Sequence, residues 1–218
     1  MLIAEAISAG WKIEEQFIAP GGLAVLGTDA RTFDLENGVM ERVASTTSPQ
    51  PVIAIAERRS SGLAAVKNAQ WVVIADRISD PGNLGTILRS AEAAGVSAVV
   101  LTPGTVEAFN PKVVRASAGA MFHVPIIEDV SVEEIRDNGF KVFGTSSHDQ
   151  DGSIEFTASD LTGKIALLVG NEAHGLDDNA TVDAWLTIPH RGRSESLNVA
   201  MACTLVCFEA ARQRESNS

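Results

Sequence analysis

Short apolar runs alternate with longer segments of mixed polarity along most of the chain. The apolar runs lie at Trp71–Ala75, Ala98–Leu101, Lys141–Gly144, Lys164–Val169 and Trp185–Ile188. Because these runs have few polar positions, they predict strands that are buried on both faces of a sheet. Strands that alternate with helices at this spacing predict an α/β fold with a mainly parallel sheet covered on both faces.

Residues that cap helices mark where the intervening helices begin. Asn110, followed by Pro111, opens one helix, and Ser131 with Glu134 forms a capping box for the next. Asn83 is placed to cap an earlier helix over Leu84–Ala94, after the turn that Asp80 begins. These caps predict three helices between the first and third strands.

The last predicted helix, Leu197–Gln213, is apolar almost all the way round, and Glu209 is its only charge before Ala211. A helix without a polar face must be covered on every side. Burial within one chain provides such a cover, and so does a second subunit. The second arrangement predicts a homodimer.

The first 60 residues form a separate pattern. Helices are predicted up to Gly10 and over Gly38–Ala44, and strands over Ile13–Ala19 and Pro51–Ala56. Two helices and two strands bury little surface, so this unit either leans on a larger domain or is the remnant of a fuller one. The predicted organisation is a small domain at residues 1–60, a linker at residues 61–69 and a main domain at residues 70–218.

The chain has 218 residues and a formal net charge of −11. This charge argues against a protein that holds nucleic acid by bulk electrostatics. The basic residues are nevertheless bunched, in the pairs Arg58 and Arg59, Lys112 and Arg115, and Arg191 and Arg193. A locally basic cleft and ordinary solvated surface charges both fit these pairs.

Several classes of protein are disfavoured. No apolar run approaches the roughly 20 residues of a membrane span, so no membrane partner is expected. Cys203 and Cys207 resemble buried thiols of a reducing compartment, which predicts a cytoplasmic location. The histidines lack ligand spacing, so no metal site is expected. Neither a dinucleotide-binding glycine motif, nor a P-loop, nor a G-x-S-x-G nucleophile turn is present.

Three short runs join polar or glycine-rich turns to apolar segments: Asn83–Arg89, Gly170–Gly175 and Ser196–Ala200. Polar turns at the ends of buried strands are the usual place for a site on an α/β scaffold. In the first run, Gly85 and Arg89 lie four residues apart on one helical face. That spacing lets backbone approach a ligand beside a guanidinium suited to phosphate or to a developing oxyanion. A capped helix with a surface arginine is the plainer alternative.

The other two runs also have two interpretations. The turn after Gly170 is expected to leave backbone N–H groups open to a ligand, with Glu172 holding a cation or an arginine. Alternatively, Glu172 complements the N-terminus of a helix near Leu176. Ser196 is placed as the N-cap of the last helix, and the Asn198 amide needs a partner if it is buried.

In this order and with this spacing, the three runs resemble the signature motifs of the SpoU (TrmH-like) class of SPOUT RNA methyltransferases, over residues ~70–213. The resemblance implies transfer of a methyl group from S-adenosylmethionine to a ribose 2′-hydroxyl of RNA. It also implies a C-terminal trefoil knot in the α/β domain, a rare exception to the rule against threaded chains. Enzymes of this class act as homodimers, in keeping with the apolar last helix.

Residues 5–17 resemble part of the L30e-like substrate-binding domain that many of these enzymes carry, although its usual preceding strand is absent. An incomplete domain of this kind favours ribosomal RNA as the substrate. A tRNA 2′-O-methyltransferase and a non-catalytic RNA-binding dimer are the alternatives. A hydrolase that uses Ser196 with His190 would lack an orienting acid and a nucleophile turn.

The resemblance assigns the site residue by residue. The residues with catalytic roles are Asn83, Arg89, Glu172, Ser196 and Asn198. The cofactor S-adenosylmethionine is assigned to Gly144, Thr145, Ser146, Gly170, Ile188 and Leu197.

A guanidinium is very hard to deprotonate, so Arg89 is expected to clamp a phosphate and stabilise the nascent alkoxide. Glu172 and Asn83 are expected to orient Arg89. Ser196 and Asn198 are expected to align the RNA and the motif loops.

Overall fold

The computed structural model describes residues 2–44, 46, 48–146, 152–176, 180–193 and 196–216. The chain forms two compact units, Met1–Arg59 and Ser60–Ser218. Within the described ranges, no helix is long and apolar enough to cross a membrane.

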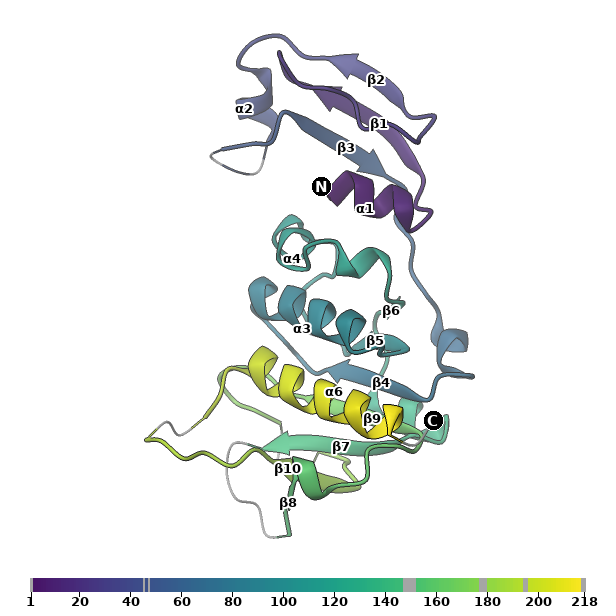
Figure 1. Ribbon diagram of the computed structural model, residues 1–218, viewed down its shortest axis with the longest axis vertical. Coiled ribbons are helices and arrows are strands. Elements are labelled where there is room, and N and C mark those ends of the chain that lie inside the picture. The colour runs from purple at the N-terminus through teal and green to yellow at the C-terminus, as the bar shows by residue number, and fades with distance from the viewer. Residues whose placement is uncertain are drawn as a thin grey trace. The chain divides into compact units, whose positions relative to one another are not determined.

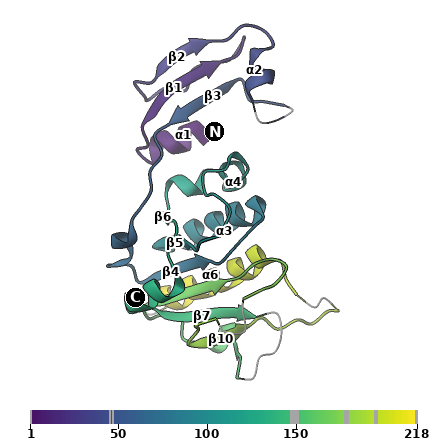
Figure 2. The ribbon, with the colours of Figure 1, turned by 180° about the vertical axis from the view of Figure 1, so that it is seen from behind.

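The first unit is a three-stranded sheet with two short helices (Figure 2). Its elements are α1 (Leu2–Ser8), β1 (Ile13–Ile18), β2 (Arg31–Asp34), α2 (Val39–Val43) and β3 (Val52–Ala56). Strand β1 pairs in parallel with β2 and antiparallel with β3. Both helices and two of the strands were predicted. Strand β2 was not, because all four of its residues are exposed and give no apolar alternation.

The second unit is built on a seven-stranded sheet in the order β6-β5-β4-β9-β7-β10-β8 (Figure 1). Its strands are β4 (Trp71–Ala75), β5 (Ala98–Leu101), β6 (Ile126–Ile127), β7 (Lys141–Ser146), β8 (Ile154–Glu155), β9 (Ile165–Val169) and β10 (Ala184–Thr187). Every described strand pair of this sheet is parallel, which confirms the predicted sheet. The two-residue edge strands β6 and β8 were not predicted.

Four α-helices and three short 3₁₀ helices complete this unit. They are η1 (Leu63–Val66), α3 (Pro81–Ala93), α4 (Pro111–Ala116), η2 (Ala120–Phe122), α5 (Val132–Asp137), η3 (Phe156–Ala158) and α6 (Val199–Glu215). Two predicted caps are confirmed. The Asn110 side chain accepts a hydrogen bond from the N–H of Lys112, and Ser131 and Glu134 form a complete capping box.

The core lies on both faces of the sheet, and alternate residues of β4 show how it is divided. Val73 packs in a cluster with residues of α3 and α6, whereas Ile74 packs in a second cluster with Ile135 of α5. Helices α3 and α6 lie side by side over the first face (Figures 1 and 2). The second face also receives Val66 of η1, within the segment predicted as a linker. That segment is therefore packed against the larger unit.

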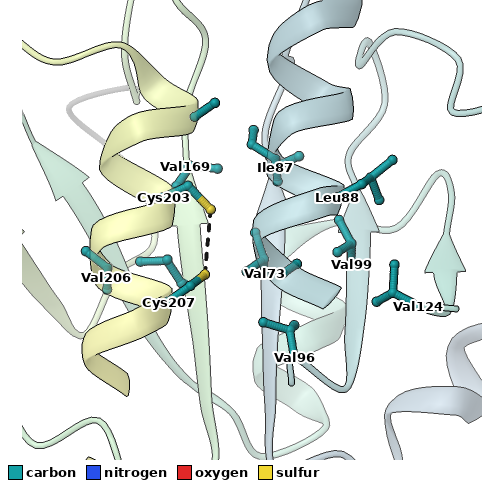
Figure 3. Close-up of a cluster of buried hydrophobic side chains, with 14 of the residues drawn as sticks. Val73, Ile87, Leu88, Val96, Val99, Val124, Val169, Cys203, Val206 and Cys207 are labelled. Carbon is teal, nitrogen blue, oxygen red and sulfur yellow. Dashed lines mark hydrogen bonds between the residues drawn. The ribbon is translucent and has the colours of Figure 1, made fainter. Parts of the chain in front are cut away.

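Figure 3 shows the contact between α3 and α6, where Cys203 and Cys207 point toward Ile87 and Val73. Both thiols are buried and free, as expected, and their sulfur atoms lie 3.8 Å apart. The hydrogen bond between them, together with burial, raises the pKa of the Cys207 thiol. The hydroxyls of Ser90 and Thr204 lie 2.6 Å apart and also join the two helices.

One stripe of α6 is left uncovered by its own chain. Met201, Leu205 and Phe208 are 61%, 43% and 50% exposed. Their spacing places them on a single helical face. Full burial of this helix within one chain, the alternative to a subunit contact, is therefore wrong.

Candidate functional site

The first run forms the N-terminal turn of α3, directly after the loop that follows β4. The helix begins one turn earlier than predicted. Asp80, not Asn83, is its N-cap, and its side chain accepts a hydrogen bond of 2.8 Å from the N–H of Asn83. Pro81 occupies the first helical position, where a missing N–H costs nothing. The Asn83 side chain is thereby released from capping and is free to bind elsewhere.

Gly85 serves helix packing. The sequence had suggested instead that it lets the backbone approach a ligand. A Cβ atom at this position would lie 2.4 Å from the Cβ of Ala116 and 2.9 Å from the N of Ser117. Only glycine lets α3 and α4 approach this closely. The glycine therefore fixes the position of α3, on which both Asn83 and Arg89 lie.

The second run forms a tight turn directly after β9. A Cβ atom on Gly170 would lie 2.6 Å from the carbonyl carbon of Gly175, so the turn closes on itself. The Asn171 side-chain oxygen accepts hydrogen bonds from the N–H groups of Ala173 and His174, at 2.9 and 3.1 Å. The expectation that these N–H groups are open to a ligand is therefore wrong, because the turn satisfies them internally.

Glu172 lies at the tip of this turn and binds the loop after β4. Its carboxylate accepts hydrogen bonds from Ser79, through the hydroxyl at 2.9 Å and the N–H at 3.2 Å. It also accepts bonds of 3.0 Å from the N–H of Asp80 and from the side-chain amide of Asn83. Glu172 thus joins two loops that lie about 90 residues apart in the chain.

These donors control the charge of Glu172. Partial burial raises the pKa of its carboxyl group, but hydrogen bonds outweigh that effect and lower the pKa to about 2. The strongest donor is the Asn83 amide, followed by backbone N–H groups that include those of Asp80 and Ser79. At neutral pH, Glu172 is therefore a fixed carboxylate and a weak proton acceptor.

The third run enters the same network through Asn198. Its side-chain amide donates a hydrogen bond of 2.9 Å to the Oδ1 of Asn83. Its own oxygen accepts from the N–H groups of Ala200 and Met201, which makes Asn198, not Ser196, the N-cap of α6. Ser196 is exposed two residues before this cap. Asn198 is exposed, so the burial that would require a partner is not found, but its amide is bonded to Asn83 all the same.

Glu172, Asn83 and Asn198 therefore form one continuous chain of hydrogen bonds across the three runs. Strands β4 and β9 pair in parallel, so the loops after them leave the same edge of the sheet. In the sheet, β4 and β9 are neighbours. After β4 the chain goes on to β5, on the far side of β4 from β9. After β9 it goes on to β10, on the far side of β9 from β4 and beyond β7. Ligands of open α/β sheets bind in the crevice at such a switch point.

Arg89 lies apart from this network within its own chain. It is exposed on α3, six residues after Asn83, which corresponds to about 9 Å along the helix axis. The hydrogen bonds of Glu172 and Asn83 go to other partners. The expectation that these two residues orient Arg89 is therefore wrong for contacts within one chain, and they position α3 instead.

The residues assigned to the cofactor follow three neighbouring strands. Thr145 and Ser146 end β7, Gly170 follows β9, and Ile188 follows β10. These strands are adjacent and parallel, so their carboxyl ends meet at one edge. Leu197 comes just before α6, and both Ile188 and Leu197 are half-buried. The side chain of Ser146 lies outside the described residues.

Gly144 has a packing role in addition to any contact with a ligand. A Cβ atom here would lie 2.8 Å from the ring of Trp185 and 2.9 Å from the Cγ1 of Val182. The glycine lets the indole of Trp185 in β10 approach β7 this closely.

The sequence interpretation missed Ser79, Asp80 and Asn171. For Asp80 a signal existed, since an aspartate before a proline is a typical helix N-cap. For Ser79 no local signal was available, because its role depends on a contact between distant loops. Asn171 accepts locally from Ala173 and His174, and its further bond to the carbonyl oxygen of Arg77 could not be read from the sequence. Among the described residues, no three His, Cys, Asp or Glu side chains gather as metal ligands.

A parallel sheet with polar loops that converge on one carboxyl edge defines a ligand-binding α/β domain. A model of the SpoU rRNA Methylase family matches residues 70–208, and the chain belongs to this family. The resemblance found in the three runs is thereby confirmed.

Individual relatives agree with this assignment. The chain is 36% identical over 188 residues to the 23S rRNA (guanosine(2553)-2′-O)-methyltransferase RlmP of Bacillus subtilis, and the match covers 84% of this chain and 73% of that protein. The crystal structure of the SpoU methyltransferase AviRb from Streptomyces viridochromogenes matches with a TM-score of 0.86 at 27% identity, over 99% of this chain and 88% of that one. An AdoMet-bound rRNA methyltransferase from Sinorhizobium meliloti matches with a TM-score of 0.83 at 30% identity, over 97% and 84%.

Proposed function

We propose that this protein is an S-adenosylmethionine-dependent RNA methyltransferase that methylates a ribose 2′-hydroxyl in ribosomal RNA. The observation that carries the proposal is the Glu172–Asn83–Asn198 chain, which joins the three motifs at one edge of the sheet. The Bacillus subtilis relative is named for 2′-O-methylation of 23S rRNA. Ribosomal RNA is therefore favoured over tRNA, and a cytoplasmic setting follows from that substrate.

The crevice suits S-adenosylmethionine by its chemistry. Half-buried Ile188 and Leu197 supply apolar surface for an adenine ring, and the adjacent ends of β7 and β9 supply backbone groups for its polar atoms. The structure from Sinorhizobium meliloti is described as bound to AdoMet. When bound, the cofactor supplies an activated methyl group on a sulfonium leaving group.

The residues of the chain perform positioning and charge stabilisation. Glu172, Asn83 and Asn198 hold the three loops in a fixed relation, so that the 2′-oxygen is placed in line with the methyl group. Arg89 clamps the adjacent phosphate and stabilises the nascent alkoxide. Ser196, exposed before the cap of α6, aligns the RNA.

The exposed stripe of α6 supports a homodimer. Met201, Leu205 and Phe208 form an apolar face that would be covered by a second copy of this chain. Arg89 lies on α3, which packs beside α6, so the same contact would bring Arg89 toward the crevice of the partner subunit. An arginine supplied across the interface accounts for its lack of contact with Glu172.

The trefoil knot is also part of the proposal. Strand β10 lies beyond β7 on one side of β9, whereas α6, which follows it, packs against α3. The chain must therefore cross back over β7 and β9, as a knotted C-terminal segment does. Residues 147–151, 177–179 and 194–195 lie outside the described residues.

Calorimetry with S-adenosylmethionine separates this function from that of a non-catalytic RNA-binding dimer. The proposal expects saturable binding at one site per chain. A purified, folded dimer that binds RNA but shows no heat of cofactor binding would overturn the proposal in favour of the non-catalytic alternative.

A further inference from the structure

His174 lies two residues after Glu172, in the turn that closes the carboxyl end of β9. Its side chain is exposed, and its ring Nδ1 lies 3.2 Å from the Oδ1 of Asn171. The turn is closely packed, because a side chain at Gly170 would meet the backbone of Gly175. His174 is therefore an imidazole held in a defined place beside the network that joins the three motifs.

The orientation of Asn171 fixes which ring nitrogen of His174 carries the proton. The Asn171 Nδ2 donates a hydrogen bond of 2.9 Å to the carbonyl oxygen of Arg77. Its Oδ1 therefore faces the turn, where it also accepts from the N–H groups of Ala173 and His174. Because an amide oxygen only accepts, the Nδ1 of His174 must be the donor. In the neutral ring, the Nε2 then keeps its lone pair and is free to accept a proton.

Methylation of a ribose hydroxyl needs such an acceptor, and the other motif residues do not provide one. Arg89 is a guanidinium, which stays protonated in proteins. Glu172 already accepts four hydrogen bonds, which lower its pKa to about 2. Asn83 and Asn198 are amides and do not titrate.

The charged groups on the segments bonded to this turn are few. Asp76 and Arg77 pair with each other at 2.9 Å, and Arg77 bonds to the turn through its backbone oxygen. Glu172 and Asp80 are linked through the Asp80 N–H. The carboxylate of Glu172, two residues before His174, is thus occupied by its own hydrogen-bond donors.

We propose that the Nε2 of His174 accepts the proton of the ribose 2′-hydroxyl during methyl transfer. This inference rests on the proposed function. The 2′-O–H bond breaks as the proton moves to the Nε2, the 2′-oxygen forms a bond to the methyl carbon, and the bond from that carbon to sulfur breaks. The products are a 2′-O-methyl ribose, neutral S-adenosylhomocysteine and an imidazolium, which returns its proton to water.

Single-turnover methylation by His174→Ala, measured across pH, tests this assignment. The wild-type rate should rise with pH, because only the neutral imidazole can accept the proton. The variant should lose that rise and be slower at neutral pH by about 100-fold or more, with unchanged affinity for S-adenosylmethionine by calorimetry. His123→Ala is the matched control, because His123 is an exposed histidine that precedes β6 at the opposite, amino edge of the sheet.

The outcomes separate this inference from the proposed function. If the wild type transfers no methyl group, the proposed function fails. If the wild type is active and His174→Ala stays within about twofold of it, or loses cofactor affinity instead of rate, the role of His174 fails. NMR of nitrogen-labelled wild-type protein gives a readout without substrate. A proton on the Nδ1 of neutral His174 is expected, and a proton on the Nε2 would overturn the assignment.

Discussion

The side-chain amide of Asn198 donates a hydrogen bond of 2.9 Å to the side-chain oxygen of Asn83, 115 residues earlier in the chain. Asn83 in turn donates to Glu172 at 3.0 Å. Each of these residues belongs to a different motif. Asn83 lies in the first turn of α3, Glu172 in the turn after β9, and Asn198 caps α6. These bonds hold the three motifs together at one edge of the sheet, and the proposed site depends on that connection.

A double-mutant cycle measures the bond between the two amides. Asn83→Ala and Asn198→Ala should each destabilise the fold, and the double variant should lose less than the sum, with a coupling of about 0.5–1.5 kcal/mol. Urea unfolding of the four proteins checks this. Additive losses would mean that the bond contributes nothing to stability.

The pH dependence of stability should report the ionised state of Glu172. Its folded-state pKa of about 2 lies below the ordinary value of 4.5, so the carboxylate stabilises the fold above about pH 4.5. That contribution is lost as the pH falls through about 2. The difference in unfolding free energy between wild type and Glu172→Gln should therefore be largest near neutral pH and shrink as the solution is acidified. A difference that grows on acidification would contradict the assignment.

Gly85→Ala tests the close contact of α3 with α4. Alanine in a helix normally stabilises by about 0.5–1 kcal/mol relative to glycine. Here its Cβ would lie 2.4 Å from that of Ala116, so we expect a net loss of about 1–3 kcal/mol in thermal or urea unfolding. Gly62→Ala, where a Cβ meets nothing within 4 Å, is the control and should change little.

The sequence predicted the elements that have a strong local signal. The buried strands, the Asn110 cap and the Ser131 capping box are all found where the pattern placed them. The errors have two causes. Strand β2 is short and exposed, so it gives no apolar alternation. The caps of α3 and α6 are Asp80 and Asn198, each close to the predicted residue, because several polar residues near a helix start compete for that role.

For the candidate site too, local features could be predicted and long-range contacts could not. The identity of the motif residues was readable from the chain, but their partners were not. Glu172 was expected to hold a cation or an arginine, and it binds the loop of Ser79 and Asp80 instead. A pairing between loops about 90 residues apart depends on strand order, which hydrophobic periodicity does not specify.

The apolar stripe of α6 should hold two copies of the chain together. We expect the wild type to be a dimer in solution and Phe208→Glu to be a folded monomer with little methyltransferase activity. Val43→Glu is the matched control, because Val43 is 57% exposed on α2, outside the stripe. Light scattering coupled to size exclusion checks both. A monomeric wild type, or a Phe208→Glu variant that stays dimeric, would show that this stripe is not the dimer interface.

Arg89→Ala should slow the chemical step and leave the fold intact. Loss of a charged group that stabilises a developing oxyanion lowers rates by about 100–1,000-fold. Arg136→Ala removes an arginine from α5, on the opposite face of the sheet, and should keep near-normal activity. Single-turnover methylation compares the two. Equal rates for both variants would show that Arg89 has no part in the reaction.

The most direct test of the proposed function follows the methyl group to its acceptor. Purified protein is incubated with 23S rRNA and isotope-labelled S-adenosylmethionine, and the RNA is digested to nucleosides for mass spectrometry. We expect the label in one 2′-O-methylnucleoside, and none when Arg89→Ala replaces the wild type for the same brief incubation. Label on a nucleobase would contradict the proposed function. So would the absence of label in the RNA when the protein is a dimer that binds the cofactor.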